Sequence, residues 1–132
     1  DNTRRDSVRI LEVPSGSDDV AAPEAKDLKV TVFSAHGLRK ADVLGLSDPY
    51  CVCEIQGKTD SRFQTPVLTK TLNPVWDHSG EVTGYVPGDS LLFTVWDWDR
   101  HKRDDFLGQA VVSAAQFRDG FEGELTLQRS GK

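Results

Sequence analysis

The sequence has few of the features that would place it in a membrane, in a disulfide scaffold or on nucleic acid. No run of 18 apolar residues occurs, so no segment is expected to span a bilayer and any membrane contact would be peripheral. The formal net charge is −5, whereas a general nucleic-acid binder needs a net basic surface. Only two cysteines are present, which is too few for a disulfide framework or a four-ligand zinc site. The 132 residues therefore predict one ordinary domain, in which Cys51 and Cys53 pack as small apolar residues.

Short alternating apolar runs, separated by turn residues, predict an all-β domain. The alternation begins at Leu28, Val30 and Val32. Later predicted strands are Tyr50–Ile55, Arg62–Thr71, Glu81–Val86, Leu91–Trp98, Leu107–Val112 and Gly123–Gln128. Pro66 suits an edge strand, and Val112–Phe117 has room for one helical turn. Short strands at this spacing favour an antiparallel β-sandwich.

The first 27 residues differ in texture from the rest. They are polar and irregular, except for an apolar alternation around Val8 and Ile10. We interpret residues 1–27 as an N-terminal extension and residues 28–130 as the domain. Residues 8–13 are either an additional strand of the sandwich or part of a tail.

Two aspartates follow the strongest predicted strand. Leu91, Phe93 and Val95 share one face, and continued alternation places Asp97 and Asp99 on that same face. Two neighbouring carboxylates repel each other unless a positive charge lies between them, and oxygen ligands without sulfur or imidazole favour calcium or magnesium. The stretch is also compatible with a strand that runs into a solvated loop. An EF-hand is excluded, because its spacing puts Lys102 at the glycine position and Gly108 at the terminal glutamate position.

Four short stretches, in order over residues 28–128, resemble the C2 domain, the calcium- and lipid-binding module of conventional protein kinase C and the synaptotagmins. The matching stretches are Ser47-Asp48-Pro49-Tyr50, residues 69–76 (Thr-Lys-Thr-Leu-Asn-Pro-Val-Trp), Val95-Trp96-Asp97-Trp98-Asp99 and Asp105-Phe106-Leu107-Gly108. The resemblance implies an eight-stranded antiparallel Greek-key β-sandwich with calcium-binding loops at one end. The family has two circularly related topologies, between which the sequence does not decide.

The resemblance also implies a set of calcium ligands. The carboxylates are those of Asp42, Asp48, Asp97, Asp99 and Asp105, and the backbone carbonyls are those of Ala41 and Trp98. Asp104 is out of register with the family pattern, so we interpret it as a solvated charge. Lys102 stands where several relatives offer a small polar ligand, so two calcium ions are expected rather than three. Asn73-Pro74 and Trp76 are interpreted as a tight turn and a core anchor.

The loop tips beside these aspartates suit a membrane surface. The apolar tip is Val43, Leu44 and Leu46, and the basic tip is Arg100, His101, Lys102 and Arg103. Loop packing would also explain the apolar tip, and a solvated loop would explain the basic one. Some relatives bind phosphoinositides through a lysine-rich strand. Here the corresponding stretch offers Lys58, Arg62 and Lys70, but it is diluted by Asp60, Gln64 and Thr69.

We therefore predict calcium-dependent binding to anionic phospholipid membranes of the phosphatidylserine type. The monomeric domain would bring a larger parent protein to the cytosolic face of a membrane, as a cytoplasmic, peripheral component of signalling or membrane traffic. The sequence contains no nucleophile elbow and no phosphate-cradling glycine loop, so no enzymatic activity is expected. Two alternatives remain: a calcium-independent protein-interaction module on the same fold, and a calcium-stabilised structural domain without a membrane role.

Overall fold

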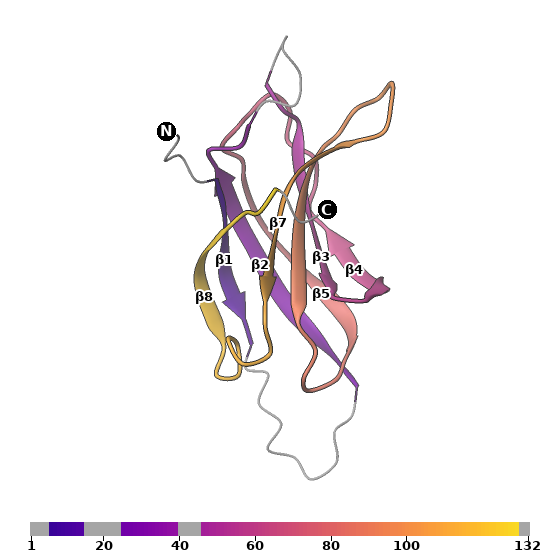
Figure 1. The fold of residues 1–132 in the computed structure, drawn as a ribbon, viewed down its shortest axis with the longest axis vertical. Coiled ribbons are helices and arrows are strands. Elements are labelled where there is room, and N and C mark those ends of the chain that lie inside the picture. Colours follow the sequence, from indigo (N-terminus) through magenta and orange to yellow (C-terminus); the bar gives the residue numbers. More distant parts are fainter. Residues whose placement is uncertain (1–5, 15–24, 40–45, 130–132) are drawn as a thin grey trace.

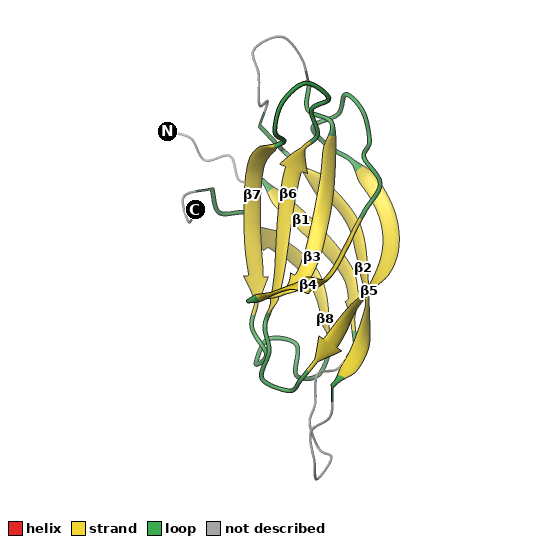
Figure 2. Cartoon of the chain, turned by 90° about the vertical axis from the view of Figure 1, so that its right-hand side faces the viewer, coloured by secondary structure: helices red, strands yellow, loops and turns green. Residues whose placement is uncertain are grey.

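Eight β-strands in two layers make up the described part of the chain. The computed structural model describes residues 6–14, 25–39 and 46–129. The strands are β1 (Ser7–Val13), β2 (Lys26–His36), β3 (Pro49–Ile55), β4 (Lys58–Gln64), β5 (Val75–Tyr85), β6 (Leu91–Asp97), β7 (Asp105–Val112) and β8 (Phe121–Thr126). One sheet has the order β5-β2-β1-β8 and the other β4-β3-β6-β7, and all paired neighbours are antiparallel (Figures 1 and 2). The predicted eight-stranded antiparallel β-sandwich is confirmed.

The core lies between the two sheets and is made by the inward row of each strand. Side chains that alternate along β2 and β6, such as Val30, Val32, Phe93 and Val95, are fully buried. Each such side chain contributes on the order of 1.5–3 kcal/mol by leaving water. Both cysteines are also buried as predicted, and burial raises the pKa of the Cys53 thiol well above its usual range.

The apolar stretch near the start of the sequence is a strand of the sandwich. β1 lies between β2 and β8, with Val8 paired to Ala35 on one side and to Leu125 on the other. Val8 and Ile10 are fully buried in the common core. Of the two topologies that the sequence left open, the structure has the one in which the additional strand comes first.

Two strand predictions were wrong in their boundaries. The strand predicted over Arg62–Thr71 starts at Lys58 and ends at Gln64, and it ends there because Pro66 has no N–H to continue the ladder. Beyond Gln64 the chain follows β3 irregularly, with the Thr65 amide donating to the Cys51 carbonyl at 2.9 Å. β4 is an edge strand, as predicted. The possible helical turn over Val112–Phe117 is instead a run of turns over residues 114–119.

The second strand with a wrong boundary is β5, which was predicted to begin at Glu81 but begins at Val75. Its first half is polar and largely exposed, because β5 is the edge of its sheet. Gly80 lies in this half, where a Cβ atom would stand 2.3 Å from Cδ1 of Phe63 on β4. The missing side chain therefore lets the edges of the two sheets come together.

The described chain begins and ends at the same end of the sandwich. Ser7, the first residue of β1, pairs both with His36 at the end of β2 and with Thr126 at the end of β8. A guanidinium N–H of Arg129 donates to the nearly buried Asp6 carboxylate at 2.7 Å. The Leu127 amide donates to the Asp6 carbonyl at 3.0 Å, so main-chain and side-chain bonds both fasten this end.

Candidate functional site

Adjacent strand ends bring the predicted aspartates together at one end of the second sheet. Asp97, the last residue of β6, pairs with Pro49 of β3 on one side and with Asp105 of β7 on the other. Residues directly opposite each other in antiparallel strands point to the same face, about 5 Å apart. Asp48 immediately precedes Pro49, and its carboxylate lines the same hollow as those of Asp97 and Asp99. Figure 1 shows the β6–β7 loop at the upper end of the molecule, away from the loop that joins β5 to β6.

Asp97 continues the inward row of β6, as predicted from the alternation. Its exposure is only 7%, although it is charged and stands at the end of a strand. The Asp48 amide donates to Asp97 Oδ1 at 2.8 Å, and the Trp98 amide donates to the Asp48 carbonyl at 2.9 Å. These bonds fix the β3 and β6 ends to each other.

The loop between β4 and β5, residues 65–74, holds Asp48 in place. The Lys70 amide donates to Asp48 Oδ1 at 2.7 Å, and the Thr71 amide donates to the Ser47 carbonyl at 2.9 Å. Trp76 is buried, and its indole N–H donates to the Pro49 carbonyl at 3.3 Å. Its predicted role as a core anchor is confirmed, and the anchor holds the strand start beside Asp48.

Asp99 organises the loop that follows β6. Its Oδ1 accepts the His101 amide at 2.7 Å and the Lys102 amide at 3.1 Å. These backbone donors, the His101 amide first, hold the pKa of the Asp99 carboxyl below its usual range. The Lys102 ammonium donates to Asp105 Oδ2 at 2.9 Å and lies 3.6 Å from Asp99 Oδ2. The bond to Asp105 is the main cause that raises the pKa of Lys102.

A hollow of about 210 Å³ opens between Asp48, Asp97 and Asp99. Leu46, Trp98, Arg100 and His101 complete its lining. Among the described residues, no three side chains of histidine, cysteine, aspartate or glutamate lie close enough together to hold a metal ion. Of the predicted ligands and lipid contacts, Ala41, Asp42, Val43 and Leu44 lie outside the described residues.

The donors nevertheless suit a hard divalent cation. The side-chain donors gathered here are carboxylate oxygens. Such ligands suit calcium and magnesium better than they suit zinc or copper. The Lys102 ammonium, bonded to Asp105 and near Asp99, already places one positive charge among them.

The predicted membrane contacts that the structure describes are exposed. Leu46, from the apolar tip, is 48% exposed, and Trp98, which was predicted only as a backbone ligand, is 42% exposed. The four residues of the basic tip are exposed as well: Arg100, His101, Lys102 and Arg103. Solvated positions are what both interpretations of the basic tip require, so its role stays a prediction.

Asp104 is not the solvated charge that was predicted. Its Oδ1 accepts the Asp99 amide at 3.0 Å, and its Oδ2 accepts a short hydrogen bond from the Tyr50 hydroxyl. Burial, and then this bond, raise the pKa of the Tyr50 phenol above its usual range. Asp104 therefore ties the β6–β7 loop to β3. The missed signal is register: Tyr50 pairs with Trp96, one residue from the end of β6.

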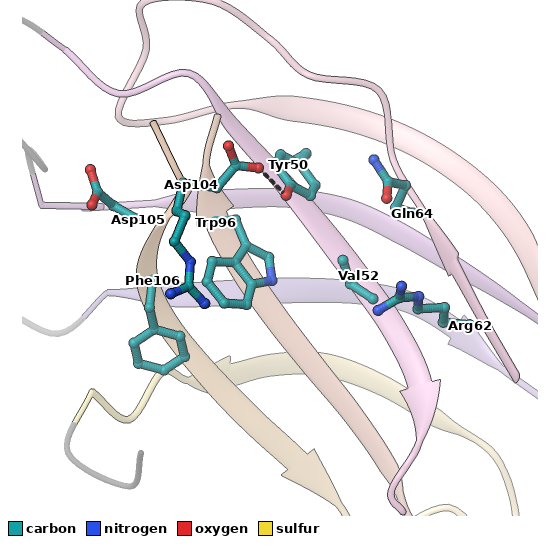
Figure 3. Close-up of a pocket in the computed structure, with 9 residues that line it drawn as sticks. Tyr50, Val52, Arg62, Gln64, Trp96, Asp104, Asp105 and Phe106 are labelled. Carbon is teal, nitrogen blue, oxygen red and sulfur yellow. Dashed lines mark hydrogen bonds between the residues drawn. The ribbon is translucent and has the colours of Figure 1, made fainter. Parts of the chain in front are cut away.

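A second hollow, of about 500 Å³, lies on the outer face of the same sheet (Figure 3). Trp96 and Phe106 line it and meet edge to face, with ring centroids 5.8 Å apart. Its basic groups are Arg62 and Arg103, while Val52 and Gln64 occupy neighbouring strand positions. Of the three basic residues predicted for a phosphoinositide strand, only Arg62 reaches it. Lys58 is instead paired with Asp89 at 2.9 Å.

Comparison with known proteins decides the family. The family model for the C2 domain matches residues 26–128.

This chain belongs to the C2 domain family.

Calcium and phospholipid binding are typical of C2 domains, which are binding modules. A multiple C2 and transmembrane domain-containing protein of Drosophila melanogaster is 38% identical over 101 residues, which is 76% of this chain and 11% of that protein. Tricalbin-3 of Saccharomyces cerevisiae is 29% identical over 98% of this chain, which covers 9% of its length. This C2 domain thus spans about a tenth of the curated relatives it matches.

Solved structures agree with the fold. A C2 domain of RIM from Drosophila superposes with a TM-score of 0.71 and 23% identity, covering 94% of this chain and 98% of that one. A C2 domain of plant extended synaptotagmin 1 superposes with a TM-score of 0.63 and 25% identity, covering 76% of this chain and 89% of that one. Within the described residues of this C2 domain, no helix is long and apolar enough to cross a membrane.

Replacing Tyr50 with phenylalanine tests the support of the loop by Asp104. We expect Tyr50→Phe to lower the free energy of unfolding by about 0.5–1.5 kcal/mol, the usual net value of one hydrogen bond. Amide exchange at Asp99 should also become faster. Because the phenol pKa is raised in the folded state, this contribution is complete below the unfolded pKa and is lost as pH rises through the folded pKa. Urea unfolding of both proteins and of Asp104→Asn measures the effect, and an unchanged amide exchange rate at Asp99 contradicts it.

Proposed function

We propose that this C2 domain binds calcium at its aspartate-bearing end and then docks on anionic phospholipid membranes. The observation that carries the proposal is the pairing of Asp97 with Asp105 at the ends of β6 and β7, with Asp48 bonded to Asp97 just before β3 and Asp99 in the next loop. The family pattern adds Asp42 and the carbonyls of Ala41 and Trp98, and with them two calcium ions. Asp48 and Asp97 are held by main-chain amides, so they are prepositioned rather than gathered at the moment of binding.

The negative charge of the aspartates would make membrane binding depend on bound calcium. The aspartate row presents negative charge at the end that would meet the bilayer, and anionic headgroups repel such a surface. Calcium bound there would supply positive charge and open coordination positions for lipid phosphate oxygens. Occupancy would thereby act as an electrostatic switch, and calcium and lipid would strengthen each other's binding.

Two kinds of side chain support a contact with the bilayer. Leu46 and Trp98 line the hollow between the aspartates and are exposed, so they would enter the interfacial region. Arg100 and Arg103, with Lys102, extend from the neighbouring loop, where basic side chains are attracted to an anionic lipid surface. The apolar residues Val43 and Leu44 would belong to the same contact surface.

Liposome sedimentation tests the proposal. Purified protein is mixed with phosphatidylserine-containing or phosphatidylcholine-only liposomes, with calcium or with a chelator. We expect pelleting only with phosphatidylserine and calcium together, and release when the chelator is added. Equal pelleting with and without calcium would contradict the proposal.

The alternative interpretations predict different results. A calcium-independent protein-interaction module shows no calcium binding by calorimetry at millimolar concentrations. A calcium-stabilised structural domain has a calcium-raised melting temperature without liposome binding. If the proposal holds, the domain would bring a larger parent protein to the cytosolic face of a membrane, as a peripheral and monomeric unit. The chain's own role would then be binding, and any enzymatic activity would belong to another part of that protein.

A further inference from the structure

Lys102 is anchored to the aspartate cluster through both its main chain and its side chain. Its amide donates to Asp99 Oδ1 at 3.1 Å. Its ammonium donates to Asp105 Oδ2 at 2.9 Å and stands 3.6 Å from Asp99 Oδ2. One cationic group thus bridges two carboxylates that the proposed calcium site would use.

The bridge and a bound calcium ion require the same oxygens. Calcium lies about 2.3–2.6 Å from its oxygen ligands in proteins. An ammonium within hydrogen-bond distance of these carboxylates would lie close to an ion that the same carboxylates coordinate, and two cations so close repel each other. We therefore expect calcium that coordinates Asp99 and Asp105 to displace the ammonium. The Lys102 side chain is 57% exposed, so water is available to receive it.

We propose that Lys102 is a tethered competitor of the divalent cation, which raises the calcium concentration needed to fill the site. The proposal rests on the proposed function, since it concerns the same site. The family resemblance implies only that Lys102 fails to provide a calcium ligand. If that were its whole effect, replacing Lys102 with another residue that cannot ligate calcium would leave the calcium affinity unchanged. If Lys102 is a competitor, removing its positive charge should raise the calcium affinity.

The test is the dissociation constant for calcium, measured by titration calorimetry without lipid. We expect Lys102→Met, which offers no oxygen ligand, to bind calcium about 1.5- to 5-fold more tightly than the unmodified protein, the factor that one exposed ion pair typically provides. Lys102→Arg keeps the charge and should bind calcium like the unmodified protein. Lys26→Met is the matched control, because it removes one positive charge from the exposed first residue of β2, at the opposite end of the sandwich from the aspartates.

The outcomes separate the competitor from the calcium site itself. Equal affinities for the unmodified protein and Lys102→Met would overturn the competitor alone, as would an equal gain in Lys26→Met. Absence of calcium binding in every variant would overturn the proposed function and the competitor with it. As a second readout, the Lys102 side-chain NMR resonances should move to free-lysine positions when calcium is added. Resonances that stay unchanged at saturating calcium would also overturn the competitor.

Discussion

Replacing Asp97 and Asp99 together with asparagine should abolish calcium-dependent docking. We expect the affinity for calcium to fall more than about 100-fold, because even groups that only orient a metal ligand commonly contribute about 10- to 100-fold. Asparagine keeps the size of the side chain and its carbonyl oxygen but removes the charge that attracts the ion. Pelleting with phosphatidylserine liposomes should then be the same with calcium and with chelator.

A matched variant separates this local effect from a change in net charge. Asp60 and Asp119 lie toward the opposite end of the sandwich, in β4 and in the turns that follow β7. Asp60→Asn with Asp119→Asn removes the same number of charges and should leave both calcium affinity and pelleting unchanged. Calcium-dependent pelleting that survives in the Asp97 and Asp99 variant would remove the aspartate row from the mechanism.

Truncating Trp76 should cost more stability than any surface change considered above. We expect Trp76→Ala to lower the free energy of unfolding by about 3–5 kcal/mol, the usual range for a buried aromatic side chain. Because the indole also donates to the Pro49 carbonyl, the variant should weaken calcium binding by releasing the start of β3 beside Asp48. Urea unfolding and calcium calorimetry measure the two effects on one protein.

Two further variants identify which part of Trp76 matters. Trp76→Phe keeps an aromatic ring without the N–H donor, so it should lose less stability than Trp76→Ala. Phe117→Ala truncates a fully buried aromatic beyond the far end of β7, and it should lower stability without changing calcium affinity. A stability loss below about 1 kcal/mol in Trp76→Ala, which is ordinary for any substitution, would contradict the anchor role.

The sequence predicted those strands in which apolar and polar residues alternate. Leu91, Phe93, Val95 and Asp97 all lie in the buried row of β6, because a strand returns to the same face every second residue. The first half of β5 was missed because an exposed edge strand needs no apolar row, and Asp77 and Ser79 are exposed there. Apolar alternation shows which side chains of a segment are buried. It does not show that an exposed, polar segment pairs with a neighbour as an edge strand.

Contacts between strands were harder to predict from the sequence than the identity of the site residues. The family pattern placed Asp97 and Asp105, and the register shows that they are direct partners. The bond between Tyr50 and Asp104 joins residues 54 positions apart, so it depends on a strand register that one sequence does not specify. The bridge made by Lys102 depends in turn on how Asp99 folds the loop over its own carboxylate.

The position of β1 beside β8 also sets how the domain would respond to mechanical tension. Asp6 and Arg129 leave the sandwich at the same end, and the strands behind them are antiparallel neighbours. A force that pulls these two residues apart acts across the strands, so it loads the bonds one after another, first those of Asp6 to Arg129 and Leu127 and then the ladder from Ser7 and Thr126 onward. Bonds loaded in succession resist less than bonds sheared together. Tension carried by the flanking chain would therefore unzip β1 from β8 at low force, starting from the aspartate-bearing end.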